Sequence, residues 1–179
     1  MSNKGGQHPS KPISVPAYGP HWATHLPILA KVLAASNGPV LELGIGIFST
    51  PLLHSWCDAE KRFLDSYEND ERWTHRHEHW MTPLHHITYV KNWDDVPIEK
   101  RHWGVVFVDH SGHRREVDAI RAAQYADYVV LHDTNGRYDP EYHYSKAYPY
   151  FKYKYIFDKI YPHTTVVSNF YDVKNIWMT

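Results

Sequence analysis

Four acidic residues and two glycines stand at or near the ends of apolar stretches, and these residue types can hold a polar ligand. Glycine lets the backbone approach a bound molecule closely, while a carboxylate accepts hydrogen bonds from hydroxyl groups or binds a cation. The residues are Glu42, Gly44, Gly46, Glu68, Asp109 and Asp133. Their spacing predicts one site that binds a ligand carrying hydroxyl and charged groups.

Alternating strands and helices must position these residues. Apolar and β-branched runs predict strands at residues 39–43, 62–67, 85–90, 104–109 and 127–133, and a 3.6-residue period predicts helices at 21–36, 50–56, 71–80 and 114–125. Pro27 either bends the first helix or marks its start, and Ser49 or Thr50 is expected to cap the second. This alternation favours right-handed crossovers and a parallel sheet covered on both faces.

The C-terminal part of the chain has a different pattern. Residues 151–157 and 163–170 are rich in β-formers, and the five residues DKIYP between them are too few for a crossover helix. They predict an antiparallel hairpin at one edge of the sheet. The expected fold class is therefore α/β and Rossmann-like, with a mostly parallel seven-stranded sheet, a C-terminal antiparallel hairpin and helices on both faces.

Length and composition limit the classes of function. With 179 residues, we expect one domain over residues 21–179, after a flexible arm rich in Gly and Pro over residues 1–20. Lys and Arg number 19 against 20 Asp and Glu, so we expect no nucleic-acid partner. The sequence shows no apolar signal segment or membrane span, and its one cysteine, Cys57, suits a reducing compartment. We therefore expect a soluble, cytoplasmic protein without a membrane partner.

The glycine motif narrows the type of ligand. A dinucleotide-binding loop has a third glycine where this chain has Ser49, whereas Glu42 stands two residues before Gly44. In this the chain resembles the class I S-adenosylmethionine-dependent methyltransferases, in particular small O-methyltransferases, over roughly residues 38–170. The resemblance implies that Glu68 takes both ribose hydroxyls, that Asn92 and Trp93 contact adenine, and that Glu42 helps to hold the methionine end. The implied cofactor-binding residues are Glu42, Gly44, Gly46, Ser49, Thr50, Glu68, Asn92, Trp93 and Asp109.

A metal is a further implication that the residues leave open. Metal-dependent catechol-type O-methyltransferases hold magnesium with an Asp after the fourth strand and an Asp-Asn pair after the fifth. Here Asp109 and Asp133 match, but Thr134 stands at the Asn position and Asn135 follows one place later. The chain is thus expected either to bind Mg²⁺ or another divalent cation through Asp109, Asp133 and Asn135, or to work without one.

The resemblance also implies the reaction, which is methyl transfer to a small-molecule acceptor at a hydroxyl oxygen. His110 is the first candidate for the general base because its unperturbed pKa lies near neutrality, and His132 and Asp133 are its rivals. The expected catalytic residues are thus Asp109, His110 and Asp133. The arm and the Tyr-rich stretch at 137–151 are expected to shape the acceptor site, alone or with a neighbouring subunit of a homo-oligomer. Cleavage of the same cofactor, or binding without catalysis, are the alternative functions.

Overall fold

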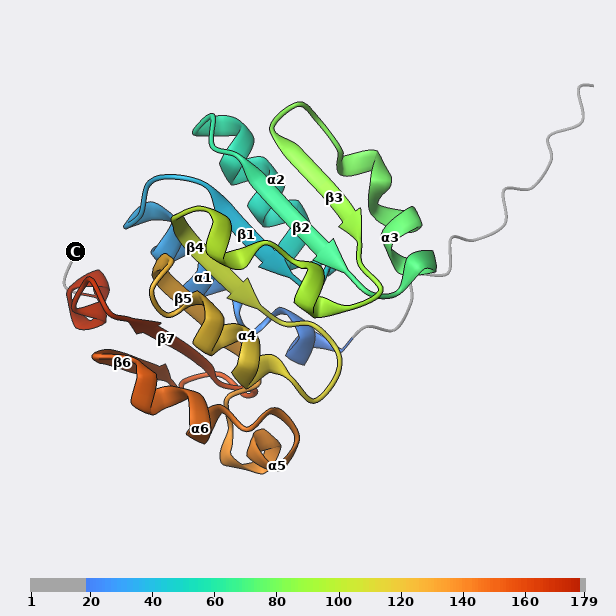
Figure 1. Cartoon of the computed structure of the whole chain (residues 1–179). Coiled ribbons are helices and arrows are strands. Elements are labelled where there is room, and N and C mark those ends of the chain that lie inside the picture. Colours follow the sequence, from blue (N-terminus) through green and yellow to red (C-terminus); the bar gives the residue numbers. More distant parts are fainter. Residues whose placement is uncertain (1–18, 178–179) are drawn as a thin grey trace, which may run out of the picture.

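A twisted seven-stranded sheet lies at the centre of residues 19–177, the part of the chain that the computed structural model describes (Figure 1). The strand order is β3-β2-β1-β4-β5-β7-β6; the first five strands are parallel, and β7 runs antiparallel to both of its neighbours. The predicted fold class is confirmed. The strands are β1 (Val40–Leu43), β2 (Leu64–Glu68), β3 (His85–Tyr89), β4 (Trp103–Val108), β5 (Ala126–His132), β6 (Tyr153–Phe157) and β7 (Thr164–Ser168).

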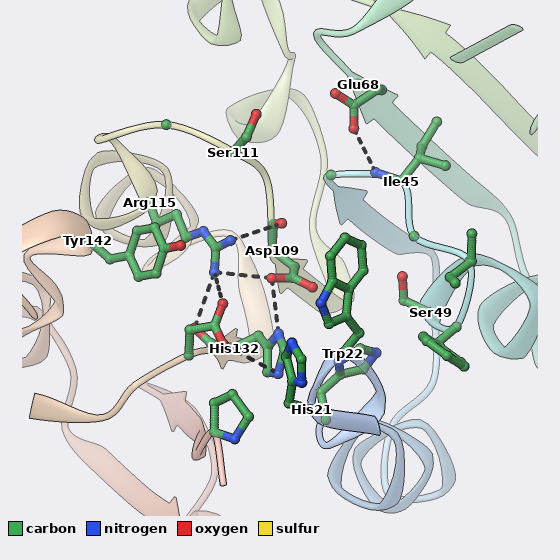
Figure 2. A pocket seen from close by; sticks show the side chains of 18 of the residues that line it. His21, Trp22, Ile45, Ser49, Glu68, Asp109, Ser111, Arg115, His132 and Tyr142 are labelled. Atoms are coloured by element: carbon green, nitrogen blue, oxygen red, sulfur yellow. Dashed lines mark hydrogen bonds and ion pairs between the residues drawn. The ribbon is translucent and has the colours of Figure 1, made fainter. Parts of the chain in front are cut away.

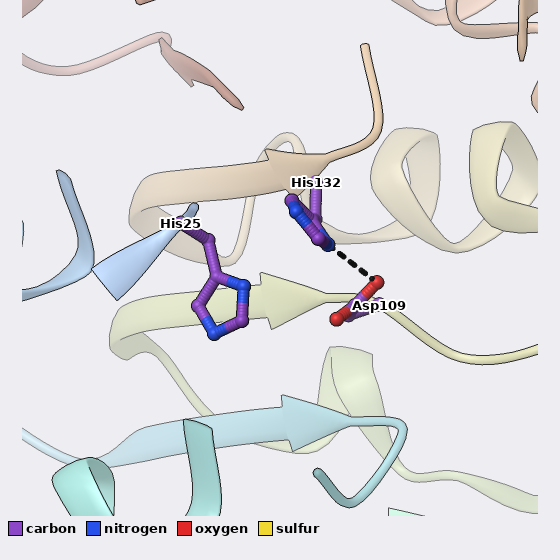
Figure 3. A group of neighbouring side chains, drawn as sticks. All are labelled: His25, Asp109 and His132. Atoms are coloured by element: carbon purple, nitrogen blue, oxygen red, sulfur yellow. Dashed lines mark hydrogen bonds and ion pairs between the residues drawn. The ribbon is translucent and has the colours of Figure 1, made fainter. Parts of the chain in front are cut away.

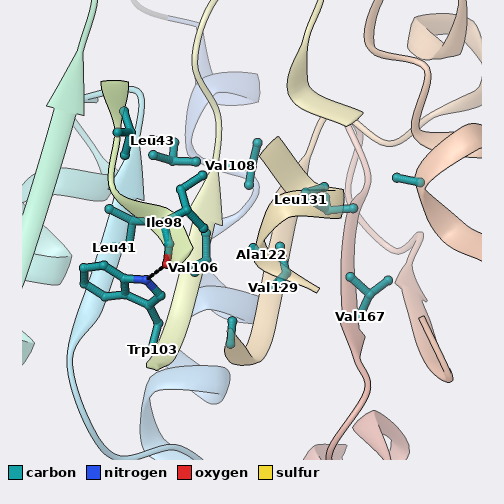
Figure 4. Packing of buried hydrophobic residues seen from close by; sticks show 14 of the residues in the cluster. Leu41, Leu43, Ile98, Trp103, Val106, Val108, Ala122, Val129, Leu131 and Val167 are labelled. Atoms are coloured by element: carbon teal, nitrogen blue, oxygen red, sulfur yellow. Dashed lines mark hydrogen bonds between the residues drawn. The ribbon is translucent and has the colours of Figure 1, made fainter. Parts of the chain in front are cut away.

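Helices cover both faces of this sheet and enclose two apolar layers. One layer packs α1 and α2 against the sheet, and the other packs α4 and α6 against the opposite face. Strand residues alternate between the layers, so that Val40 belongs to the first and Leu41 to the second. Figure 4 shows the second layer, in which the indole of Trp103 donates to the carbonyl of Ile98 at 2.8 Å. The α-helices are α1 (Leu26–Ala34), α2 (Ser49–Ala59), α3 (Glu71–His77), α4 (Arg115–Ala122), α5 (Asp139–Tyr142) and α6 (Tyr144–Ala147).

The first helix begins later than the apolar period predicts. A 3-10 turn, η1 (Pro20–Ala23), comes first, and α1 starts at Leu26 with Pro27 in its first turn. Proline lacks an N–H and its ring collides with the preceding turn, so it marks the start of the helix. As a result, residues 21–25 lie beside the carboxyl ends of the strands.

The start of α2 also differs from the prediction. Phe48 occupies the N-cap position without a side-chain hydrogen bond, and both Ser49 and Thr50 lie inside the helix. The Thr50 hydroxyl is engaged elsewhere, because it donates to Glu42 beneath the glycine loop. Cys57 is buried in the last turn of α2, as a small apolar residue would be.

Two further predictions concern the N-terminal arm and membrane spans. Most of the predicted flexible arm, residues 1–18, lies outside the described residues. Among the helices of residues 19–177, the structure holds none with the length and hydrophobicity that a membrane span needs.

Candidate functional site

A pocket of about 520 Å³ lies at the carboxyl ends of β1, β2, β4 and β5 (Figure 2). The strand order reverses between β1 and β4, and open α/β sheets bind ligands at such a point. The volume is within the range of small-molecule sites. Seven of the residues that the sequence singles out line this pocket from four strand ends: Gly44, Gly46, Ser49, Glu68, Asp109, His132 and Asp133.

The glycine loop after β1 forms one wall. Gly44 has φ +96°, and a Cβ there would lie 2.5 Å from the backbone N and Cα of His110. Only glycine fits this close crossing of two strand ends. The Gly46 N–H donates to the Thr50 hydroxyl at 3.0 Å, which fixes the loop to the first turn of α2.

Glu42 supports this loop from behind and does not line the pocket. Its fully buried carboxylate accepts hydrogen bonds from Thr50 at 2.9 Å and from Ser66 at 2.6 Å. Burial raises the pKa of Glu42 to about 7, although the hydroxyl donors oppose the shift. The structure therefore places Glu42 and Thr50 beneath the predicted cofactor site, where they fix the backbone.

Glu68 lies at the end of β2 and faces the pocket. One carboxylate oxygen accepts the backbone N–H groups of Asn69 and Asp70 at 2.8 and 2.9 Å, and the other accepts the N–H of Ile45 at 3.1 Å. A carboxylate has about four acceptor positions, so about one remains for a ligand hydroxyl. The family resemblance implied that Glu68 accepts both ribose hydroxyls, which would require one of the backbone donors to move.

Two predicted adenine contacts lie away from the pocket. Asn92 accepts the N–H of Asp94 at 3.1 Å and so caps a 3-10 turn. Trp93 is 5% exposed and stacks on His110 with ring centroids 4.3 Å apart. In their place, Trp73 lines the pocket, with its indole N–H donating to the Ile45 carbonyl at 2.6 Å.

His110 is not available as a general base in this structure. Its ring is fully buried, with Nε2 3.0 Å from an oxygen of Asp118 and Nδ1 3.0 Å from the Ser111 carbonyl. Successive side chains at a strand end point in opposite directions, so Asp109 faces the pocket and His110 faces away. This corrects the sequence-based choice of His110 as the base.

Arg115 occupies the space between the two predicted metal-binding carboxylates. Its Nη1 lies 3.1 Å from Asp109 Oδ1 and 3.3 Å from Asp133 Oδ2, and the side chain is almost fully buried. Asn135 is directed elsewhere, since its Oδ1 accepts the His163 N–H at 2.7 Å. The residues therefore do not fit a magnesium ion held by Asp109, Asp133 and Asn135; a fixed guanidinium neutralises the carboxylates instead.

The pKa values of the two carboxyl groups move in opposite directions. Burial alone would raise the pKa of Asp109, but the charges of His132 and Arg115 hold it well below its usual range. The pKa of Asp133 is raised, mainly by burial. The charge of His132 opposes this rise, whereas the negative charge of Asp109 adds to it. Asp133 is thus the better proton acceptor of the two, because a carboxylate with a raised pKa binds a proton more tightly.

Two histidines complete this side of the pocket. His132 Nδ1 lies 3.1 Å from Asp109 Oδ1, and its Nε2 lies 3.0 Å from the Thr24 hydroxyl. Burial would lower the pKa of His132, but the adjacent Asp109 raises it above the usual value. His25, which the sequence gave no reason to select, is 2% exposed and lies against His132 with ring centroids 4.6 Å apart.

The Tyr-rich stretch contributes only in part. Tyr138 and Tyr142 line the pocket, and the Tyr142 ring lies 4.0 Å from the Arg115 guanidinium carbon. Tyr144 packs into the apolar layer beneath α6. From the opposite side, Trp22 of η1 reaches the same pocket, so aromatic rings flank its carboxylate end.

Comparison with known proteins identifies the fold. No protein-family model matches the chain, and no curated protein matches its sequence. Among solved structures, the CurJ carbon methyltransferase is similar with a TM-score of 0.54 and 11% identity over 76% of this chain and 50% of that one. This chain thus spans about half the length of that protein. At this identity the likeness shows the fold alone, which is that of the class I methyltransferases.

The same comparison overturns one prediction. The 16S rRNA methylase ArmA is similar with a TM-score of 0.47 and 14% identity over 82% of this chain and 80% of that one. The 23S rRNA methyltransferase ErmE gives 0.46 and 13% over 85% and 72%. The exclusion of nucleic acid from the partners, drawn from balanced charge, was wrong, since enzymes of rRNA are among the structural neighbours.

Proposed function

We propose that this chain, which has the class I S-adenosylmethionine-dependent methyltransferase fold, transfers a methyl group from that cofactor to a hydroxyl oxygen. The observation that carries the proposal is the composition of the pocket. It joins a glycine loop and a strand-end glutamate to a partly buried pair of aspartates. The first group suits a ligand with ribose hydroxyls, and the second suits an acceptor that must lose a proton.

The cofactor side of the pocket fits the proposed ligand. A side chain at Gly44 would fill the space where two strand ends cross, and Glu68 keeps about one acceptor position for a hydroxyl. When bound, S-adenosylmethionine supplies a methyl group on a positively charged sulfur. Gly46 and Ser49 line the same wall, while Glu42 and Thr50 hold it in place.

Asp133 is the proposed proton acceptor. Its Oδ2 contacts Arg115, whereas Oδ1 lies 3.7 Å from His132 Nε2 and has acceptor capacity left for a hydroxyl. The acceptor oxygen forms the new bond to the methyl carbon, the carbon–sulfur bond breaks with its electron pair going to sulfur, and the hydroxyl proton passes to Asp133. Arg115 keeps both carboxylates in fixed positions, which places the oxygen for an in-line attack.

The acceptor end of the pocket favours a flat or sugar-like hydroxyl compound. Trp22, Tyr138 and Tyr142 present aromatic rings beside the carboxylates, and such rings stack on planar or ring-shaped groups. A hydroxyl group on an aromatic or sugar ring occurs both in small molecules and within larger ones such as RNA. The experiment therefore includes both kinds of acceptor.

The test is to follow the methyl label from S-adenosylmethionine into panels of phenolic and sugar acceptors and into RNA. We expect label in one panel, and Asp133→Asn should lower kcat by about 10² to 10⁴-fold with cofactor affinity unchanged. Asp127→Asn is the matched control, because Asp127 lies near the other end of β5 and bonds His102. Cofactor breakdown without labelled product would indicate cleavage, and binding without turnover would indicate a non-catalytic role; either result would contradict the proposal.

A further inference from the structure

Three side chains that could coordinate a cation converge on the carboxylate side of the pocket (Figure 3). His25 precedes α1, Asp109 follows β4 and His132 ends β5. One ligand atom from each of the three lies within 4.8 Å of the others. All three residues also line the pocket, so a ligand held there would face the acceptor space.

His25 provides a second and independent observation. Its side chain is 2% exposed, and within the described residues neither ring nitrogen has a hydrogen-bond partner. Leaving buried polar atoms unpaired costs about 1–3 kcal/mol, so such groups normally meet protein, water or an ion. The ring packs against Phe107 and His132, with centroids 4.9 and 4.6 Å away, and one of its nitrogens lies within 4.8 Å of a ligand atom of Asp109 and of His132.

We propose that His25, Asp109 and His132 bind a divalent transition-metal ion such as Zn²⁺. Two imidazoles and one carboxylate are the donor set that such ions take, whereas Mg²⁺ and Ca²⁺ prefer oxygen ligands throughout. The site shares Asp109 with the magnesium site expected from the sequence but uses two histidines in place of Asp133 and Asn135. It therefore differs in position and in metal class.

The surroundings have room and charge for the ion. The contacts of Asp109 with His132 and with Arg115 both end on Oδ1, which leaves Oδ2 for a cation. A metal-binding imidazole is neutral, and Asp109, Asp133 and Arg115 together then carry one net negative charge, so a dication brings the local charge only to plus one. If His132 binds through Nδ1, its Nε2–H donates to the Thr24 hydroxyl, and a partner of this type is usual behind a metal-binding histidine.

The role of the ion rests on the proposed function, although its binding does not. Three protein ligands leave at least one coordination position open, and here that position faces the pocket. An acceptor hydroxyl bound there would lose its proton more easily, because a divalent ion lowers the pKa of a coordinated oxygen. Asp133 lies next to His132 and is placed to receive that proton.

The experiment measures metal binding by the full-length protein in the absence of S-adenosylmethionine. After treatment with a chelator and dialysis, the protein is titrated with Zn²⁺ in a calorimeter, and with Co²⁺ while the visible absorption of the ion is recorded. We expect one tight site, a Co²⁺ spectrum with nitrogen ligation, and no competition from Mg²⁺. His25→Ala should weaken this site more than about 100-fold, since even the partners behind a ligand are worth about 10 to 100-fold.

Controls separate this site from the other histidines of a chain that contains 15. His75→Ala removes an exposed imidazole from α3 and should leave the tight site unchanged. Thr24→Val should weaken binding about 10-fold by removing the partner of His132. The proposal fails if the native protein takes up no stoichiometric Zn²⁺ or Co²⁺, or if folded His25→Ala binds as tightly as the native protein. Separate calorimetry with S-adenosylmethionine shows whether the protein binds the cofactor, and so tests the proposed function independently of the metal site.

Discussion

The two sides of the pocket are built in different ways. The β1–β2 side consists of the glycine loop and Glu68, and nearly all of its hydrogen bonds involve backbone groups close in space to the strand ends. The β4–β5 side consists of charged side chains from α4 and two strand ends, with Arg115 at its centre. The first side is therefore shaped by hydrogen bonds to the backbone, whereas the second is held together by charge.

Removing the central cation should have the largest effect on stability. Arg115→Met leaves Asp109 and Asp133 close together, with His132 as their only remaining ion-pair partner among residues 19–177. Breaking a buried ion network in this way costs about 3 to 5 kcal/mol, which denaturant unfolding would measure. Arg101→Met is the control, because its contact with Asp65 is partly exposed and is worth less than about 1 kcal/mol. An equal loss of unfolding free energy in both variants would contradict the view that charge holds the β4–β5 side together.

A side chain in the glycine loop should have the next largest effect, and it should act on the opposite side of the pocket. Gly44→Ala adds a Cβ at positive φ and against the His110 backbone, which should cost about 2 to 4 kcal/mol and abolish cofactor binding. Gly112→Ala is the matched control, because Gly112 has φ +101° but no atom within 4 Å of the added Cβ. Gly112→Ala should lose only the stability that backbone strain at positive φ costs, about 1 to 2 kcal/mol. Equal losses would show that the close crossing does not matter.

The pH dependence of stability tests the support beneath the loop. The pKa of Glu42 is about 7 in the folded protein against 4.5 for the free side chain, so the folded state binds more protons between these values. The contribution of Glu42 therefore falls as pH rises through this window, by about 2 to 3 kcal/mol. Unfolding at pH 5 and pH 8 should show this loss in the native protein and a much smaller one in Glu42→Gln. If the native protein and Glu42→Gln lose the same stability between these pH values, a group other than Glu42 is responsible.

The smallest expected effect distinguishes the structure from the sequence-based assignment of adenine contacts. Asn92→Ala removes the cap of a 3-10 turn and should cost about 0.5 to 1 kcal/mol of stability. Because Asn92 lies off the pocket, affinity for S-adenosylhomocysteine should change less than about twofold, a shift of less than about 0.5 kcal/mol. A tenfold loss of affinity in calorimetry would instead support the sequence-based prediction that Asn92 contacts adenine.

The sequence predicts the β1–β2 side better than the β4–β5 side for a physical reason. Gly44, Gly46 and Glu68 lie at or just after the ends of their strands, and the parallel order of the strands brings them to one edge. Likewise, Asp109 and Asp133 reach the pocket because they stand at strand ends. A shift of one residue reverses the direction of a side chain, which is why His110 faces the core.

The residues that the sequence did not reveal depend on tertiary packing. His25 reaches the pocket only because Pro27 delays the start of α1, and Arg115 does so only because α4 directs its first turn at two strand ends. The family resemblance also left Asn135 open as a metal ligand, but its side-chain oxygen accepts the backbone N–H of His163. The pattern of residue types does not predict where these side chains point, because each position depends on elements distant in the sequence.

Calorimetry with S-adenosylhomocysteine tests the central claim most directly, namely that the glycine-loop side of the pocket binds the cofactor. The native protein should bind one equivalent. Glu68→Gln should weaken binding by about 10 to 100-fold, because a hydrogen bond to a charged group is worth about 1.5 to 3 kcal/mol. Glu71→Gln, a change at the exposed first residue of α3, should leave the affinity unchanged. Absence of binding to the native protein, or equal affinity in Glu68→Gln, would contradict the account.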